Sequence, residues 1–590
     1  MAHRSDGCKR LEKRTHKIHN LRDLAGFVHR PSVLLLRFPP RRSHRDAALS
    51  EKVFERISMF CERIHEESTV CILSSPPDAA RLLPYLEKCL RYQLWIAVKV
   101  RNGHYVPQSG QLGRKHAALL VLTRYRKSLR HTVTRIAYTY CPACGKTTKD
   151  YGGKKHTYNS YGTLISDVWR DIECDLSGDV PEIEERLQDL FGLPPYELLD
   201  VLDLRECPQL QPKSAGVCVG EARLPLYGIE NVPLPESRLI NDDCLKALPA
   251  LPDTSVDFCF ADPPYNIQKN YDHWNDGLEM QQYFAWCDQW LSELARILKP
   301  GCTLAVINIP LWAVRHYQHL CKILRFQAWI AWDGLSLPVR MIMPSHYAII
   351  CFSKGEPRPL PGLDAGFLSS AEGKRILPLA EFYCLRSACV ANRNGGDCSD
   401  RGEFSDLWSD IHRLKHNSRR VDHPCQLPPS LMRRLIALFT SPGEMVLDCF
   451  NGAGTTTLVA HQMGRRFIGI ELSSRYHQIA TERHDTATRG EDPFGKRNEV
   501  PHAKNSRVER LPKQRYAVSK KVLQLEVRQI ARKLGHIPTR DEVKGMSKYP
   551  IDYFDSYFIS WGEVCAAARH DGMSESPPTV VPEDRQLALF

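Results

Sequence analysis

The feature that most restricts the fold is a strand–turn–helix–strand–helix pattern, "EMVLDCFNGAGTTTLVAHQMGRRFIGIELSSRYHQIATERH", at residues 444–484. The first apolar run ends at a glycine-rich turn with Gly452 and Gly454, and a helix pattern opens at Thr455. The second apolar run ends at Glu471, 17 residues after Gly454. Two strands joined through a helix lie parallel in one sheet, with the helix on its face. The pattern therefore predicts an α/β domain.

The same turn predicts a ligand site. Gly452 and Gly454 let the backbone approach a ligand closely, and the amides of the helix that opens at Thr455 face an anion. The carboxylate of Glu471, at the end of the next strand, can hold a ribose diol, as in dinucleotide folds. The glycines are spaced G-x-G and not G-x-G-x-x-G, so a nicotinamide site is a poor match.

A second motif, "SVDFCFADPPYN", is a short apolar strand from Val256 to Phe260 that two prolines terminate. Asp262 thus lies at the carboxyl end of a strand, where open α/β sheets bind ligands. An acidic pair, Asp242 and Asp243, precedes a short helix upstream. The alternative interpretation is a plain strand-to-turn junction.

Together the two motifs resemble the amino-group DNA methyltransferases that use S-adenosylmethionine. Residues 238–485 are similar to the permuted class, in which the catalytic tetrapeptide precedes the cofactor loop. The run "HPCQLPPSLMRRLIALFTSPGEMVLDCFNGAGTT" is typical of that family and departs from it at Leu427, where a lysine is usual. The resemblance implies these catalytic residues: Asp262, Pro263, Pro264 and Tyr265. It implies these cofactor-binding residues: Asp448, Phe450, Asn451, Gly452, Gly454, Thr455 and Glu471, with Asp243 at the adenine.

The chemistry suits a weak nucleophile, the exocyclic amine of a base. The Asp262 carboxylate and the Pro263 carbonyl would accept its two N–H bonds, and an anion there stabilises the positive charge that develops on nitrogen. Tyr265 would stack on a base flipped out of the duplex. Aspartate rather than serine at position 262 favours adenine N6; cytosine N4 stays open, because family members with aspartate modify both.

An internal repeat relates residues 34–200 to residues 258–448. The paired landmarks, in order, are 34–41 with 258–265, 94–100 with 328–334, 116–122 with 346–352, 140–141 with 383–384, 166–172 with 405–411, and 186–200 with 434–448. We infer a duplicated methyltransferase domain; chance similarity of apolar runs is the alternative. Phe38 stands in place of Asp262 and Arg41 in place of Tyr265. No glycine turn follows Asp200, so we expect the first copy to be non-catalytic.

The resulting prediction is an α/β fold of two tandem Rossmann-like methyltransferase domains, the first degenerate, with a small all-α C-terminal domain. The expected boundaries are 1–215, 216–490, a basic linker at 491–518, a helical module at 519–572 and a tail at 573–590. The net charge is +12, and residues 99–155 carry thirteen Lys and Arg against one acid. Such a tract attracts nucleic acid, although a solubilising face has the same composition. The arrangement is similar to the eukaryotic mRNA adenine methyltransferase pair, in which one subunit is inactive.

The C-terminal module resembles the helical repeat appended to homing endonucleases, which implies binding to duplex DNA. Its predicted first helix spans 520–534, and Thr539–Glu542 and Ser560–Glu563 read as capping boxes. A protein-binding helical domain is the alternative. The end of the chain, Gln586–Phe590, resembles the bacterial sliding-clamp peptide, whose apolar side chains enter a groove of the partner; a tail folded onto its own core is the alternative.

The 21 cysteines include Cys141-x-x-Cys144, half of a zinc site, and Cys384-x4-Cys389 at the equivalent place in the second copy. If the two copies dock with pseudo-twofold symmetry, the two cysteine pairs would meet and form a zinc site of four thiolates. His156 and Cys398 are rival ligands, and two unrelated thiol pairs are the alternative.

We expect a cytoplasmic monomer with an internal pseudo-dimer, encoded by a bacterium, phage or mobile element. The sequence shows no secretory signal and no apolar run of membrane-spanning length. A restriction enzyme is a candidate partner. Two rival functions stay open: an RNA N6-adenine methyltransferase, and a non-enzymatic adaptor tethered to DNA or the clamp.

Overall fold

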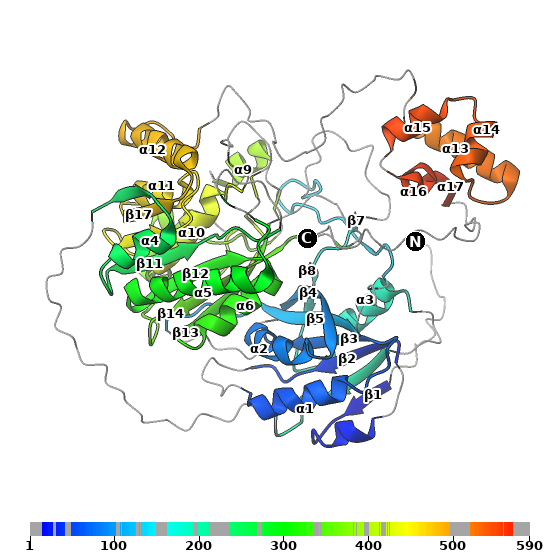
Figure 1. Cartoon of the computed structure of the whole chain (residues 1–590), viewed down its shortest axis with the longest axis horizontal. Helices are drawn as coiled ribbons and strands as arrows, with labels where there is room; N and C mark the ends of the chain where they lie inside the picture. Colours follow the sequence, from blue (N-terminus) through cyan, green and yellow to red (C-terminus); the bar gives the residue numbers. More distant parts are fainter. Residues whose placement is uncertain are drawn as a thin grey trace. The chain divides into compact units, whose positions relative to one another are not determined.

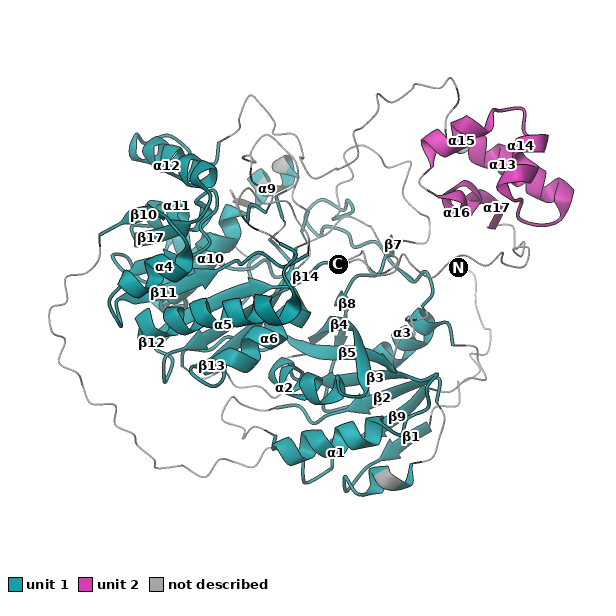
Figure 2. Ribbon diagram, in the orientation of Figure 1, with its two compact units in different colours: residues 1–502 teal, residues 503–590 magenta. Residues whose placement is uncertain are grey.

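The structure is a computed structural model, and it places the chain in two compact units, residues 1–502 and 503–590 (Figure 2). Between residues 14 and 569 it describes all positions except 28–30, 42–48, 102–106, 108, 125–128, 130, 149–161, 194–198, 212–235, 268–273, 275, 335–341, 343, 382, 385, 395–399, 412, 415–420, 422, 424, 496–517, 519 and 559. Residues 1–13 and 570–590 also lie outside the description. None of the described helices is both long and apolar enough to cross a membrane.

The first half of unit 1 is built on a seven-stranded sheet in the order β1-β9-β2-β3-β5-β4-β8 (Figure 1). Its strands are β1 (Arg14–Lys17), β2 (Val33–Arg37), β3 (Thr69–Ser74), β4 (Leu90–Val100), β5 (His116–Arg124), β8 (Val168–Cys174) and β9 (Leu199–Asp203). Leu34 and Leu36 of β2 pack with helices α1 (Glu51–Cys61) and α2 (Pro76–Leu86). Leu35 faces the other way and packs with α3 (Pro181–Phe191). Helices on both faces explain why β2 is apolar at every core position.

The second half is built on an eight-stranded sheet in the order β10-β17-β16-β11-β12-β14-β13-β15. Its strands are β10 (Arg238–Asn241), β11 (Val256–Ala261), β12 (Leu298–Asn308), β13 (Arg325–Asp333), β14 (His346–Ser353), β15 (Leu407–Trp408), β16 (Met445–Asp448) and β17 (Arg466–Glu471). Phe258 and Phe260 point to the face covered by α10 (Pro429–Phe439) and α11 (Thr455–Gln462). Cys259 and Ala261 point to the face covered by α5 (Met280–Ile297) and α6 (Pro310–Leu320). The α/β fold class is confirmed.

Shorter elements complete the unit. They are α4 (Cys244–Ala247), α7 (Ala365–Ser369), α8 (Ala371–Ile376), α9 (Ser387–Asn394), α12 (Ser474–Thr488), the strand pair β6 (Arg135–Ile136) and β7 (Thr163–Leu164), and 3₁₀ turns at Asp23–Gly26, Leu248–Ala250 and Pro361–Leu363.

The two large sheets share one strand order, which supports the predicted duplication. Starting at β9 or at β16, the neighbours follow as β2-β3-β5-β4-β8 and β11-β12-β14-β13-β15. The second sheet has one additional edge strand, β10, which pairs with β17. In the first sheet β1 lies beside β9, in the place that β17 takes beside β16. The described part of the first half therefore contains no counterpart of the segment from α11 to β17.

One detail of the repeat prediction is wrong. The sequence comparison aligns Asp200 with Asp448, but in the sheet Phe260 pairs with Asp448 and Leu36 pairs with Leu202. Phe260 and Leu36 each lie two residues before their tetrapeptide, so Leu202 is the true counterpart of Asp448. Helices α3 and α10 keep the predicted alignment, and the connection that follows α3 is two residues longer than the one that follows α10.

The two halves meet through reciprocal contacts. The Asp167 carboxylate, just before β8, accepts the backbone N–H of Ser345 at 2.8 Å and of His346 at 3.0 Å, where β14 begins. The Asp406 carboxylate, just before β15, accepts the backbone N–H of Lys115 at 2.6 Å, where β5 begins. Each half thus caps the same strand of the other, as the subunits of a twofold dimer do.

Packing follows the same symmetry. Trp95 and Trp329, which the repeat makes equivalent, stack on each other with centroids 4.7 Å apart and planes 2° apart. Helices α2 and α6, also equivalent, are in contact, and the hydrophobic core runs continuously from one half into the other. Arg170 and Asp333 form an ion pair at 3.0 Å. The halves therefore form one body rather than two domains on a string.

Unit 2 is a small helical domain. Its helices are α13 (Lys520–Leu534), α14 (Arg540–Met546), α15 (Ile551–Tyr557), α16 (Trp561–Val564) and α17 (Ala566–Arg569). Thr539 and Glu542 form a capping box, as predicted. At the second predicted box the Ser560 hydroxyl caps α16, while the Glu563 carboxylate accepts a hydrogen bond from Lys520 at 3.1 Å.

Candidate active site

The two sequence motifs meet at one edge of the second sheet. Strands β11 and β16 are parallel neighbours, and Phe260 pairs with Asp448. The Asp262 tetrapeptide and the glycine-rich turn at 449–454 therefore leave adjacent strands at their carboxyl ends. This is the position at which open α/β sheets bind ligands.

The tetrapeptide is held by its backbone. The Pro264 carbonyl accepts a hydrogen bond from the Tyr283 hydroxyl at 2.7 Å, and the Tyr265 carbonyl accepts one from the Trp312 indole at 2.8 Å. The buried Asp276 carboxylate accepts the backbone N–H of Asn266 at 2.7 Å, and Asn266 has a left-handed φ of 55°. These bonds fix the loop and leave the Asp262 side chain at the pocket wall.

The glycine turn needs residues without a Cβ. Gly452 and Gly454 have φ of 52° and 78°, a region that side chains disfavour. A Cβ at Gly452 would lie 2.8 Å from His423 Nε2, and one at Gly454 would lie 2.9 Å from Ala480 Cβ on α12. The turn is therefore packed between α12 and His423.

Three carboxylates surround this turn. Asp448 is buried, its carboxylate accepts the Phe450 N–H at 2.9 Å, and burial raises its pKa to about 6. Glu471 accepts the Gly452 N–H at 2.7 Å and the Ser473 N–H at 2.8 Å, one on each oxygen. Asp243 caps α4 by accepting the Leu245 N–H at 2.9 Å.

A single pocket collects most of the predicted site residues. Its lining includes Asp243, Asp262, Pro264, Tyr265, Asp448, Phe450, Asn451, Gly452, Thr455 and Glu471. Pro263 is buried, and Gly454 lies on the side of the turn that packs against Ala480 of α12; neither lines the pocket.

At the tetrapeptide end the pocket has an aromatic wall that the sequence reasoning missed. The ring centroid of Tyr347 lies 6.3 Å from that of Tyr265 and 5.3 Å from that of Trp332. The Arg413 guanidinium lies over the Tyr347 ring, 5.3 Å from its centroid. Burial and the Asp262 carboxylate raise the pKa of Tyr265, which keeps its hydroxyl protonated. Flat rings with a polar rim suit a nucleobase.

At the other end Trp274 and Trp286 line the pocket beside Phe450, with Trp286 and Phe450 5.7 Å apart. The residues here fit an adenosine-bearing methyl donor. Rings can hold an adenine, and the carboxylates of Asp243 and Glu471 can accept from hydroxyl or amine groups, since each oxygen takes a second donor. The Asn451 side chain packs over Gly469, and its Oδ1 accepts a hydrogen bond from the Thr457 hydroxyl at 3.0 Å, so it fixes the shape of the turn from within.

The matching edge of the first sheet is different. Phe38 is buried, and the Arg41 guanidinium donates from Nε to the Asp78 carboxylate at 2.6 Å, which holds the pKa of Asp78 low despite burial. At the end of β9 the Asp203 carboxylate is occupied by Arg205. Nothing in the described residues of this half reproduces the carboxylate and glycine turn of the second.

The structure also brings together the four predicted cysteines: Cys141, Cys144, Cys384 and Cys389. The rival ligands His156 and Cys398 lie outside the described residues, as does the Gln586–Phe590 peptide.

Comparison with known proteins gives concordant matches. A family model described as "DNA methylase", of the N6/N4 methyltransferase type, matches residues 256–482. The type II methyltransferase M.BamHI of Bacillus amyloliquefaciens is 33% identical over 241 residues, 40% of this chain and 55% of that protein. M.HpaI of Haemophilus parainfluenzae is 32% identical over 271 residues, 44% of this chain and 78% of its own. The DNA adenine methyltransferase YhdJ of Escherichia coli K12 is 30% identical over 252 residues, 42% of this chain and 83% of its own. The chain thus spans about half the length of M.BamHI and most of the other two.

Proposed function

The chain belongs to the N6/N4 family of S-adenosylmethionine-dependent DNA methyltransferases, and we propose that its own reaction is site-specific methylation of adenine N6 in duplex DNA. The observation that carries the proposal is the shared pocket of Asp262 and the glycine turn at 449–454. The similarity to YhdJ supports adenine, and aspartate at position 262 agrees with it. Methylation of cytosine N4 is the alternative outcome of the test.

Asp262 is the proposed acceptor for the target amine. The amine lone pair is delocalised into the base, and a hydrogen bond to a carboxylate draws the N–H bonds out of the ring plane. Positive charge develops on nitrogen during transfer, and the fixed anion stabilises that charge more than it stabilises the neutral amine. The Pro263 carbonyl is the second proposed acceptor.

The aromatic wall is the proposed site of the flipped base. A base must leave the duplex before its amine can reach Asp262, and unstacking costs a few kcal/mol. Stacking against Tyr265 or Tyr347 recovers about 1–3 kcal/mol. Arg413 lies at the edge of this wall, where a cation can contact the base edge or an adjacent phosphate.

The turn and its carboxylates are the proposed binding site of the methyl donor. Glu471 and Asp243 would accept its hydroxyl or amine groups, while the Thr455 end of α11 would donate to its carboxylate. When bound, S-adenosylmethionine supplies an electrophilic methyl group. The chain's part is to hold this group in line with the amine, and alignment alone is worth several kcal/mol.

We propose that the first half is a non-catalytic partner. The loss of the carboxylate at Phe38 and the ion pair between Arg41 and Asp78 support this role. Unit 2 is proposed as a second contact with duplex DNA, on its resemblance to DNA-enzyme appendages. We also propose a cytoplasmic location, a monomeric state and a restriction enzyme as partner. Clamp binding through Gln586–Phe590 is a further proposal, and deletion of residues 586–590 should abolish clamp pull-down.

The test is methyl transfer by full-length protein to duplex DNA, with modified bases read by sequencing. Asp262→Ala should lower kcat about 10²–10³-fold, as expected when a preorganised electrostatic contact to the transition state is lost. Asp262→Asn keeps the volume of the side chain and removes its charge. Its kcat should lie between the kcat of Asp262→Ala and that of the wild type. S-adenosylmethionine should bind both variants with unchanged Kd, which shows that they fold. Activity of Asp262→Ala equal to that of the parent, or equal activity on RNA, would contradict the proposal.

A further inference from the structure

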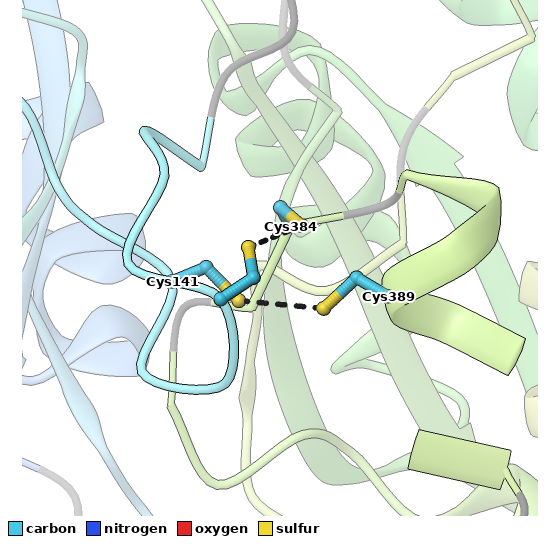
Figure 3. Close-up of side chains that lie close together, drawn as sticks. Cys141, Cys384 and Cys389 are labelled. Atoms are coloured by element: carbon cyan, nitrogen blue, oxygen red, sulfur yellow. Dashed lines mark hydrogen bonds between the residues drawn. The ribbon is translucent and has the colours of Figure 1, made fainter. Parts of the chain in front are cut away.

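We propose that Cys141, Cys144, Cys384 and Cys389 form a structural zinc site that fastens the first half of unit 1 to the second half. Their four sulfur atoms lie within 4.8 Å of one another. The closest pairs join the halves: Cys141 Sγ lies 3.7 Å from Cys389 Sγ, and Cys144 Sγ lies 3.6 Å from Cys384 Sγ. Figure 3 shows the labelled thiols turned toward a common centre from two separate stretches of chain.

These distances match a metal tetrahedron and not a disulfide. A Zn–S bond is about 2.3 Å, and the edge of a tetrahedron is about 1.63 times its centre-to-corner length, so neighbouring sulfurs should lie ~3.8 Å apart. The sulfurs of a disulfide lie about 2.05 Å apart. The two observed separations fall near the first value and far from the second.

The backbone around the first pair is shaped for this task. The Cys141 carbonyl accepts the N–H of Cys144 at 3.3 Å and of Gly145 at 2.8 Å, and Gly145 has a left-handed φ of 62°. The Cys141 N–H donates to the Lys146 carbonyl at 2.7 Å, which closes a tight hairpin. The hairpin turns both thiols of the Cys-x-x-Cys unit to one side, as zinc ligands in such units are.

The second pair is braced by arginines. Arg393 donates to the Cys384 carbonyl at 3.3 Å and to the Cys389 carbonyl at 3.4 Å, and it lies over the Tyr383 ring. Arg386 donates to the Thr147 carbonyl at 2.8 Å and so ties the second half to the first hairpin. Arg393 also pairs with Asp400 at 3.3 Å, so the Arg386 guanidinium is the group that offsets part of the net negative charge that such a site carries.

Ordinary hydrophobic packing does not explain the cluster. Cys141, Cys384 and Cys389 are 1%, 0% and 8% exposed, yet they belong to a separate group whose described members are only the four cysteines and Tyr383. Other buried cysteines, such as Cys71 and Cys259, lie in strands among the aliphatic side chains of the main cores. Four thiols grouped, among the described residues, with Tyr383 alone form a poor core but a complete ligand set, and tetrahedral sulfur sites favour zinc or iron.

The test is the metal content of tag-free, full-length protein, purified without chelator and measured by mass spectrometry of the elements. We expect one zinc per chain, and Cys144→Ser should reduce it at least twofold. Cys321→Ser, which alters an exposed thiol at the end of α6, is the matched control and should keep one zinc. Less than about 0.5 zinc per chain in the wild type, or iron in place of zinc, would overturn the assignment.

A second measurement does not depend on the folding of variants. The wild-type chain reconstituted with Co²⁺ should show the visible absorption and sulfur-to-metal charge transfer of a tetrahedral thiolate site. A protein in which non-reducing peptide mapping finds the disulfides Cys141–Cys389 and Cys144–Cys384 would reject the site.

Discussion

Substitution of Gly454 by alanine should damage the cofactor site through one identifiable contact. Gly454 has φ of 78°, and Gly464, between α11 and β17, has φ of 69°. Alanine at either position adopts a left-handed backbone at a cost of about 1–2 kcal/mol. Only at Gly454 does the new Cβ meet an obstacle, Ala480 Cβ at 2.9 Å; at Gly464 nothing lies within 4 Å. Gly464→Ala is therefore a matched control for backbone strain.

The additional cost at Gly454 follows from the overlap. Carbon atoms in contact prefer about 3.5–4.0 Å, so α12 and the turn must separate by ~0.6 Å or more. Overpacking of this kind costs about 1–3 kcal/mol. The turn carries Asn451 and Gly452. The displacement should therefore raise the Kd for S-adenosylmethionine about tenfold, which corresponds to about 1.4 kcal/mol. Gly464→Ala should change the Kd by less than about twofold.

The assay is isothermal titration of each variant with S-adenosylmethionine, with thermal unfolding midpoints measured in parallel. The double variant Gly454→Ala, Ala480→Gly removes the obstructing Cβ and leaves the milder contact with the Cα of residue 480 at 3.3 Å, so it should recover part of the lost affinity. Glycine in α12 lowers the midpoint. Equal Kd values for Gly454→Ala and Gly464→Ala would refute the contact argument. So would a double variant that binds no better than Gly454→Ala.

Three further outcomes are expected. Tyr347→Ala should raise KM for DNA about tenfold with S-adenosylmethionine binding unchanged, since a stacked base contributes about 1–3 kcal/mol; an unchanged KM would remove Tyr347 from the target site. The pKa of Asp448 is raised to about 6 from 3.8, so the folded chain binds this proton more tightly and wild-type stability falls as pH rises through that window. In cofactor-free protein, the unfolding midpoint of Asp448→Asn minus that of the wild type should rise between pH 4 and 6.5 and then stay level. A difference that does not change with pH would contradict the raised pKa of Asp448. Residues 1–502, a compact unit of their own, should keep S-adenosylmethionine affinity while losing part of their affinity for duplex DNA; undiminished DNA binding in a filter or gel assay would speak against unit 2 as a DNA contact.

Local signals explain what the sequence could predict. The prolines that follow Asp262 end β11 because proline has no backbone N–H for the sheet. The glycines at 452 and 454 mark the turn because glycine adopts a positive φ without strain. Once the repeat is recognised, the two sheets are expected to share one strand order. The two-residue offset of β9 was not predictable, since a loop can lengthen without altering the helix before it or the apolar run after it.

The pocket walls depend on tertiary structure. Trp332 and Tyr347 are paired residues on the adjacent strands β13 and β14, and Arg413 comes from a later loop. Each alone has the sequence context of an ordinary core or surface residue. The reciprocal contacts of Asp167 and Asp406 also required the structure. Their signal was present in the repeat as the shared Ser-Asp before each strand, but only docking shows which backbone each carboxylate meets.

The mutual strand capping by Asp167 and Asp406 has a consequence for how this enzyme works when scarce. Two separate subunits with such an interface dissociate on dilution, and their activity then falls with the square of their abundance. Here both partners are encoded in one polypeptide, so each meets the other at an effective concentration on the order of millimolar. A cell holding only a few molecules would still have every one of them assembled.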